Sequence, residues 1–130
     1  MNRVVHFEIH AKDMDAAQKF YGGVFGWTIT DLGPQMGNYR MVSTGTDEPG
    51  AKWPGISGGM MQRQGPSPVG GEAVNAFVCT ISVDNIDTYI AKVKAAGGTI
   101  AMDKMQVPTV GWLAYVKDLE GNLFGMLQPD

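Results

Sequence analysis

The stretch VVHFEIHAKDMDAAQKFYGGVFGW, residues 4–27, decides the fold of this chain. Its first part, residues 4–9, alternates apolar and polar side chains, and this period of two predicts a half-buried strand whose apolar residues Val5, Phe7 and Ile9 pack under the helices. Asp13 is then placed to cap a helix. The apolar positions of that helix fall on one face, and they are Met14, Ala17, Tyr21 and Phe25. The stretch therefore predicts a strand that leads directly into a helix.

The same pattern recurs later in the chain. A shift of 72 residues aligns residues 5–9 with 77–81, Asp15 with Asp87, and Gly26 with Gly98. Near the end of each half, a shift of 66 residues aligns Gly59 with Gly125. Between the halves lies QGPSPVGGE, whose proline and glycine content predicts a linker. The repeat therefore predicts one domain built from module one (1–63), the linker (64–72) and module two (73–130).

Each module is predicted to have the order βαβββ. In module two a strand over residues 76–83 precedes a helix that either Asp84 or Asn85 caps and that Gly97 follows. Three further strands follow each predicted helix: residues 27–32, 39–43 and 56–63 in module one, and 99–104, 111–116 and 123–128 in module two. The fold class is therefore α+β.

Composition excludes several classes of protein. The 130 residues are 44% hydrophobic and 18% charged, which is typical of a globular chain rather than a disordered one. The net charge is −3 and the basic residues are scattered singly, so nucleic acid is not an expected partner. No window approaches the roughly 18 apolar residues of a membrane span, so no membrane partner is expected. Cys79 is the only cysteine, which excludes an internal disulfide and fits a cytoplasmic location; its position in the strand predicts a small core residue.

The tandem βαβββ units resemble the vicinal oxygen chelate superfamily, which contains glyoxalase, bleomycin-resistance proteins, fosfomycin-resistance enzymes and extradiol dioxygenases. The pattern is most similar to small, uncharacterised proteins related to lactoylglutathione lyase. The motifs that carry the resemblance are His6-x6-Asp13, Phe20-Tyr21, Phe25-Gly26-Trp27, Ala95-Ala96-Gly97-Gly98 and Asp118-Leu119-Glu120-Gly121-Asn122. The resemblance implies an incomplete eight-stranded barrel around a cleft, and a homodimer.

The resemblance also implies where metal ligands would lie, on the first and last strands of each module. Those positions are His6, Met61 or its neighbour Gly59, Val78, and Gly125. His6 alone matches a ligand position with a residue that binds metal. Because catalytic zinc, iron or nickel sites usually need about three protein ligands, we expect no metal and no other cofactor.

The two histidines of the chain, His6 and His10, flank Glu8 on one face of the first predicted strand. At roughly 3.3 Å per residue they lie about 13 Å apart along the strand, so one ion cannot take both. On the functional interpretation, His6 and Glu8 face the cleft and act as a hydrogen-bonding or acid–base pair. On the alternative interpretation, this face is simply the more solvated side of the sheet.

An apolar cleft with few polar groups is typical of a small-molecule site. Trp53 lies in the long loop over residues 44–54, where it serves either as a lid over the cleft or in ordinary packing. The predicted ligand-binding residues are His6, Glu8, His10, Trp53, Met61, Val78, Thr80, Leu123 and Leu127.

Three hypotheses for the function follow. The first is a small-molecule-binding protein without a catalytic metal. The second is an enzyme of the lyase, isomerase or dioxygenase type, either metal-dependent or using His6 and Glu8 as acid and base. The third is a chain whose ancestral cleft serves only as a dimerisation scaffold. We favour the binding protein.

Overall fold

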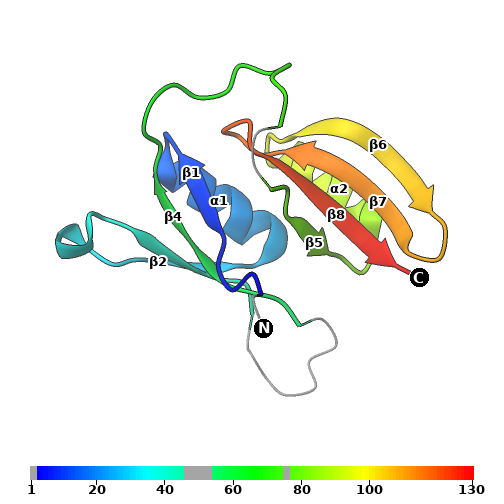
Figure 1. Cartoon of the computed structure of the whole chain (residues 1–130), viewed down its shortest axis with the longest axis horizontal. Helices are drawn as coiled ribbons and strands as arrows, with labels where there is room; N and C mark the ends of the chain where they lie inside the picture. The colour runs from blue at the N-terminus through cyan, green and yellow to red at the C-terminus, as the bar shows by residue number, and fades with distance from the viewer. Residues whose placement is uncertain (1–2, 46–53, 75–76) are drawn as a thin grey trace. The chain divides into compact units, whose positions relative to one another are not determined.

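A computed structural model of the chain describes residues 3–45, 54–74 and 77–130. The chain divides into two compact units, Met1–Pro66 and Ser67–Asp130, which contain module one and module two. In the described residues each unit has one α-helix and one four-stranded mixed sheet (Figure 1). The predicted α+β fold of two βαβββ modules is therefore confirmed. The predicted barrel and its cleft concern the placement of one module against the other, and they stay predictions.

Module one holds a sheet with the strand order β1-β4-β3-β2. Its elements are β1 (Glu8–Ala11), α1 (Met14–Phe25), β2 (Thr28–Asp31), the 3₁₀ helix η1 (Pro34–Met36), β3 (Arg40–Ser43) and β4 (Gly58–Gln62). Strands β1 and β4 are parallel, and the other neighbours are antiparallel. The carboxylate of Asp13 accepts a hydrogen bond from the backbone N–H of Ala16, which confirms it as the helix cap. Gly26 ends the helix with a φ of 72°, a left-handed conformation that glycine adopts without strain.

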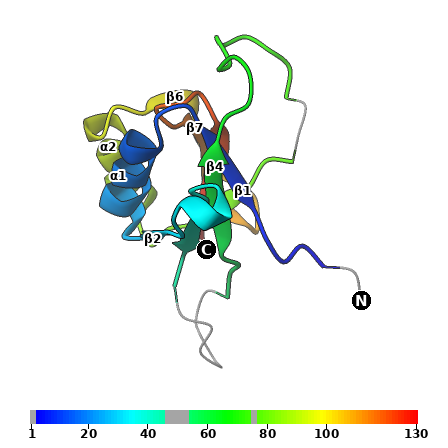
Figure 2. The same ribbon diagram turned by 90° about the vertical axis from the view of Figure 1, so that its left-hand side faces the viewer.

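One face of this sheet packs against α1, as Figure 2 shows from the side. Phe20 and Tyr21 of the helix and Val42 and Met60 of the sheet are buried. The ring of Trp27 stacks on Tyr21 with 5.3 Å between the ring centroids and 7° between the planes. These contacts form the apolar core of module one, and they leave the opposite face of the sheet without a helix of this module.

Module two repeats the arrangement with the strand order β5-β8-β7-β6. Its elements are β5 (Thr80–Ser82), α2 (Ile86–Ala95), β6 (Thr99–Val107), β7 (Gly111–Lys117) and β8 (Leu123–Pro129). Asn85, rather than Asp84, caps α2, because its side chain accepts from the backbone N–H of Thr88. Ile86 and Val93 of this helix are buried with Met126 of β8.

The registers of the two sheets agree with the internal repeat. In module one, Glu8 of β1 pairs with Gly59 of β4. In module two, Thr80 of β5 pairs with Gly125 of β8. The first residues of these pairs are 72 apart in sequence and the second are 66 apart, which are the two shifts of the repeat.

Two sequence predictions about buried residues are wrong. Val5 is 78% exposed, although the alternation placed it under the helix with Phe7. Cys79 is an exposed free thiol, although its strand position predicted a core residue. Both lie before the strand they were assigned to, because β1 begins only at Glu8 and β5 only at Thr80. Phe7 keeps its predicted side, since it is half-buried with its ring 5.7 Å from that of Trp27.

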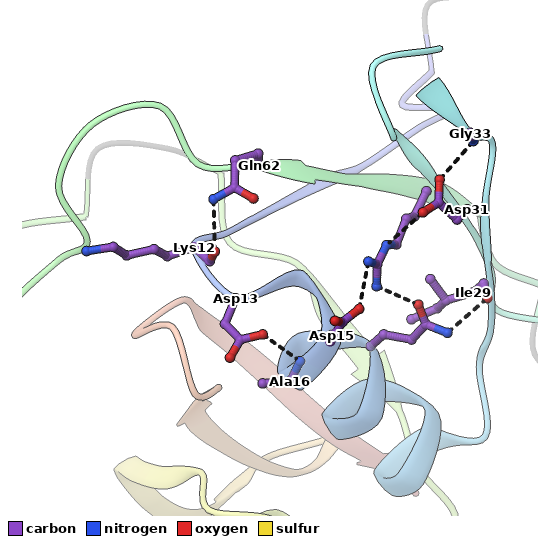
Figure 3. A network of polar contacts seen from close by, with 10 residues as sticks. Lys12, Asp13, Asp15, Ala16, Ile29, Asp31, Gly33 and Gln62 are labelled. Carbon is purple, nitrogen blue, oxygen red and sulfur yellow. Dashed lines mark hydrogen bonds and ion pairs between the residues drawn. The ribbon is translucent and has the colours of Figure 1, made fainter. Parts of the chain in front are cut away.

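Arg40 of β3 connects α1 with the first sheet through a polar network, of which Figure 3 labels Asp15, Ile29 and Asp31. Its guanidinium donates to the carboxylate of Asp15 and to the side-chain oxygen of Gln18, each at 2.8 Å. The side-chain amide of Gln18 in turn donates to the backbone carbonyl of Ile29 in β2 at 3.3 Å. This network connects one helix with two strands, and it lies beside a depression of about 660 Å³ at the start of the helix.

Among the described residues, no helix is long and apolar enough to cross a membrane.

Candidate functional site

Polar side chains gather on the face of the first sheet that points away from α1. Glu8 and His10 pair with Gly59 and Met61 of β4, so all four residues lie on this face. His6 comes two residues before Glu8 and is exposed. Tyr39, just before β3, reaches the same group of side chains through its hydroxyl. We call His6, Glu8, His10 and Tyr39 the polar cluster.

Glu8 and Tyr39 are the centre of the polar cluster. The Tyr39 hydroxyl donates to Oε2 of Glu8 at 3.1 Å, and Nε2 of His6 lies 3.0 Å from the same hydroxyl oxygen. Nε2 of His10 donates to Oε1 of Glu8 at 2.7 Å. One carboxylate therefore accepts from a phenol and an imidazole at once, and the phenol links it to the second imidazole.

Gly59 makes room for this arrangement. A Cβ atom at Gly59 would collide with the hydroxyl and the ring of Tyr39. Tyr39 therefore lies across the glycine, and this position lets its hydroxyl reach both Glu8 and His6. The equivalent glycine of module two, Gly125, has Thr80 and Tyr115 against it, so both modules place a tyrosine ring beside the glycine of their last strand.

The hydrogen bonds change the acidity of two members. The hydrogen bond from His10 holds the pKa of Glu8 below its ordinary value of 4.5, helped by the Tyr39 hydroxyl and opposed by partial burial. Partial burial raises the pKa of Tyr39 above its ordinary value of 10.0, and the carboxylate of Glu8 adds to this effect. At neutral pH the cluster thus contains an ionised Glu8 and a neutral Tyr39.

A depression of about 490 Å³ adjoins the polar cluster at His6. It lies wholly within module one, and its lining residues are Arg3, Val4, Val5, His6, Met41, Gly55, Ile56, Ser57 and Gly58. Val4, Val5, Met41 and Ile56 give it apolar surface, and Arg3, His6 and Ser57 give it hydrogen-bonding groups. Sites for small organic molecules commonly combine apolar walls with a few such polar groups.

The structure brings together only part of the predicted ligand-binding set. His6, Glu8, His10 and Met61 share one face of module one, as described above. In module two, Thr80 pairs with Gly125, and Leu123 and Leu127 lie on that same face by alternation along β8. Val78 is half-buried before β5, and Trp53 lies outside the described residues. That the faces of the two modules form one cleft stays a prediction.

Tyr39 is the member of the polar cluster that the sequence analysis missed, and so is the part that Gly59 plays in making room for it. Residues 39–43 were predicted as a strand, and alternation places Tyr39 on the same face as Met41. Met41 pairs with Gly59, which brings the tyrosine over the glycine. The alternation within residues 39–43 predicts which face of the sheet Tyr39 lies on. It does not predict that Gly59 is the neighbouring residue on β4, because the register between two strands cannot be read from either strand alone.

The side chains at the implied metal-ligand positions do not fit a metal. Gly59 and Gly125 have no donor atom, and the space beside Gly59 is filled by Tyr39. Val78 is apolar, which leaves His6 and a thioether at Met61. Across residues 3–45, 54–74 and 77–130, no three or more His, Cys, Asp or Glu side chains are placed to hold an ion. We therefore derive no chemistry through a metal.

Comparisons with known sequences connect the chain to one group of proteins. Residues 3–45 match the family described as bleomycin resistance protein-like N-terminal. Two curated relatives, both named "Putative glyoxylase CFP32", come from Mycobacterium bovis and Mycobacterium tuberculosis. Each is 31% identical over 116 residues, which cover 88% of this chain. The chain spans 40% of the length of these relatives.

Solved structures show the same fold over nearly the whole chain. TnmS3, an antibiotic binding protein from a Streptomyces species, superposes with a TM-score of 0.69 and 21% identity, covering 100% of this chain and 98% of its own. A second similar structure is a variant of the fosfomycin resistance protein FosX from Listeria monocytogenes, in complex with Mn(II) and 1S,2S-dihydroxypropylphosphonic acid. Its TM-score is 0.71 and its sequence identity is 17%, and the match covers 100% of this chain and 92% of the FosX chain. A third is a glyoxalase/bleomycin resistance protein/dioxygenase family enzyme from Burkholderia phytofirmans, with a TM-score of 0.65 and 18% identity. The match covers 93% of this chain and 94% of that enzyme.

Proposed function

We propose that the chain is a member of the vicinal oxygen chelate superfamily and that it binds a small organic molecule at the polar cluster without a catalytic metal. The single observation that carries the proposal is the convergence of His6, Glu8 and Tyr39 next to a depression that offers both apolar and polar walls. A ligand would place its apolar body in the depression and a polar group against His6. Such a division of roles is common in small-molecule sites.

Proteins of this fold both bind molecules and catalyse reactions, so the fold does not choose between the two. TnmS3 is named for antibiotic binding, and the FosX structure contains Mn(II). The side chains of this chain favour binding without a metal. The positions beside Gly59 and Gly125 offer tyrosine rings and a threonine hydroxyl rather than a set of metal-binding side chains.

Acid–base catalysis is the second candidate function, and one observation favours it. Tyr39 links the carboxylate of Glu8 to the imidazole of His6, so one hydrogen-bonded chain joins two side chains that can act as acid and base. A substrate turned over in the presence of a chelator, with the turnover lost in His6→Ala, would favour this candidate over binding alone.

The remaining parts of the proposal concern the assembly and the compartment. We propose a homodimer, because exposed apolar side chains such as Val5 at 78% and Phe77 at 100% need cover. We propose a cytoplasmic location, where the exposed thiol of Cys79 would stay reduced. Neither nucleic acid nor a membrane is a proposed partner.

Ligand-detected NMR with a set of aromatic phenols, amides and carboxylic acids tests the proposed function. Each compound is recorded with the chain in EDTA and again with Mn(II) or Zn(II) in place of the chelator. We expect hits in EDTA that persist when the metal is added. A set in which every hit needs the metal, or in which nothing binds, would contradict metal-independent binding.

A further inference from the structure

We infer that Tyr39 is a positioning residue that holds the ring proton of His6 on Nε2, so that His6 offers Nδ1 as a hydrogen-bond acceptor to the ligand. The ligand class that this arrangement selects is an apolar molecule with a hydroxyl or N–H donor, such as a phenol. This inference rests on the proposed function and adds to it the polarity of the group that is bound.

The first step is the direction of the hydrogen bonds at Tyr39. A phenol has one proton to donate, and its oxygen can also accept. The ionised carboxylate of Glu8 can only accept, and a hydrogen bond to an ionised group is the stronger kind. The Tyr39 proton therefore points to Oε2 of Glu8, at 3.1 Å. Nε2 of His6, 3.0 Å from the same oxygen, is left to donate.

The second step is that Glu8 is held in the accepting state. Its other oxygen, Oε1, already accepts from Nε2 of His10 at 2.7 Å. With a donor on each oxygen, the carboxylate gains nothing from carrying a proton of its own. The two hydrogen bonds therefore have the same direction: His6 donates to Tyr39, and Tyr39 donates to Glu8.

The third step concerns the other nitrogen of His6. When neutral imidazole carries its proton on Nε2, Nδ1 has a lone pair and accepts a hydrogen bond. Nδ1 of His6 has no hydrogen-bond partner among residues 3–45, 54–74 and 77–130. His6 also lines the depression of about 490 Å³, which is where a ligand would meet this residue.

The fourth step is the character of the neighbouring wall. Val4, Val5, Met41 and Ile56 supply apolar surface in the same depression. A ligand with a hydrogen-bond donor should bind more tightly beside such apolar surface than one without, because burying the acceptor of His6 without a partner costs free energy. The depression therefore favours a molecule with an apolar body and one donor over its methylated analogue.

Nitrogen NMR of the histidine rings tests the position of the proton. The chain contains only His6 and His10, so ¹⁵N-histidine labelling gives two ring systems, assigned with His10→Gln. At about pH 8, where an ordinary histidine is neutral, we expect His6 in the Nε2–H form. In Tyr39→Phe we expect a mixture of both forms at His6 and no change at His10. A wild-type Nδ1–H form at His6, or an unchanged His6 signal in Tyr39→Phe, would overturn the role of Tyr39.

Binding of 2-naphthol and 2-methoxynaphthalene tests the ligand class. Since one hydrogen bond contributes about 0.5–1.5 kcal/mol, we expect 2-naphthol to bind the wild-type chain about 2- to 12-fold more tightly than its ether. The two should bind equally to His6→Ala, whereas Lys104→Ala in module two should keep the wild-type ratio. Equal binding to the wild type would overturn the inferred ligand class but leave the proposed function standing. If neither compound binds to the wild type, the depression as a binding site fails, and both proposals fail with it.

Discussion

Gly59 is the residue on which the polar cluster depends most directly, although it has no side chain. A Cβ atom there would collide with Tyr39, and the φ of Gly59 lies outside the left-handed range, so alanine is compatible with its backbone. The packing around Tyr39, rather than the backbone, therefore requires glycine. A single methyl group can test how the cluster is built.

Gly59→Ala should displace the Tyr39 ring and break its hydrogen bonds to His6 and Glu8. We expect the same change at the His6 ring nitrogens as in Tyr39→Phe, although the phenol is still present. Gly23→Ala is the matched control, because a Cβ at that helix position meets nothing within 4 Å. An unchanged His6 signal in Gly59→Ala would show that Tyr39 does not depend on the glycine.

Glu8 gives a pH-dependent prediction. Its pKa is lowered in the folded chain, so the ionised form adds stability above the ordinary value of 4.5, and this contribution is lost as the pH falls through the lowered value. The wild type should therefore lose more stability than Glu8→Gln between pH 7 and about pH 3, measured by urea unfolding. The difference should be only about a few tenths of a kcal/mol, because the Glu8 side chain is 38% exposed.

Asp103→Asn, which removes an exposed carboxylate of module two, controls for the change in net charge. If Glu8→Gln and Asp103→Asn followed the wild-type acid unfolding curve equally well, the hydrogen bonds of Glu8 would make no contribution to folding.

The helices and strands were largely predictable from sequence, and the reasons are local. Asp13 and Asn85 have side chains that satisfy free N–H groups at a helix start, and this signal needs no tertiary contact. The starts of β1 and β5 were not predictable, because a strand exists only where a partner strand pairs with it. Alternation alone therefore placed Val5 in a strand that begins three residues later.

The connection between α1 and the edge of its sheet gives a prediction about stability. Arg40 is 13% exposed and bonds both Asp15 and Gln18, so Arg40→Met would leave a half-buried amide oxygen without its donor. We expect a loss of about 1–2 kcal/mol in the free energy of unfolding. Lys104→Met removes an ion pair of equal length, 2.8 Å to Asp87, and we expect a loss of about 0–1 kcal/mol because the Lys104 side chain is 34% exposed.

Chemical denaturation of the two variants compares these values directly. Equal losses for Arg40→Met and Lys104→Met would mean that the Arg40 network stabilises module one no more than an ordinary surface ion pair.

Each of the two modules has the fold that the internal repeat of the sequence predicts. The shifts of 72 and 66 residues reappear as the registers of Glu8 with Gly59 and of Thr80 with Gly125, because repeated sequence forms repeated pairing. The polar face of β1 was predictable in the same way. The role of Tyr39 was not, because it depends on which residue of β3 lies opposite Gly59, and no local pattern determines that register.

The proposed homodimer is a prediction for the entire chain. Light scattering coupled to size exclusion should give twice the chain mass of 14.0 kDa at micromolar concentration. Phe77→Ser should leave the fold intact, because this side chain is 100% exposed, and should weaken the dimer, because it removes an apolar side chain that the partner would cover. A mass of one chain at all concentrations would contradict the homodimer.

The central claim is that module one binds a small organic molecule at the polar cluster without a metal. Amide chemical-shift mapping of the metal-stripped chain with 2-naphthol in EDTA tests it most directly. The account predicts shifts concentrated at His6, Glu8, Tyr39, Met41 and Ile56, and unchanged by added Mn(II). Shifts confined to other residues, or shifts that occur only when Mn(II) is present, would contradict it.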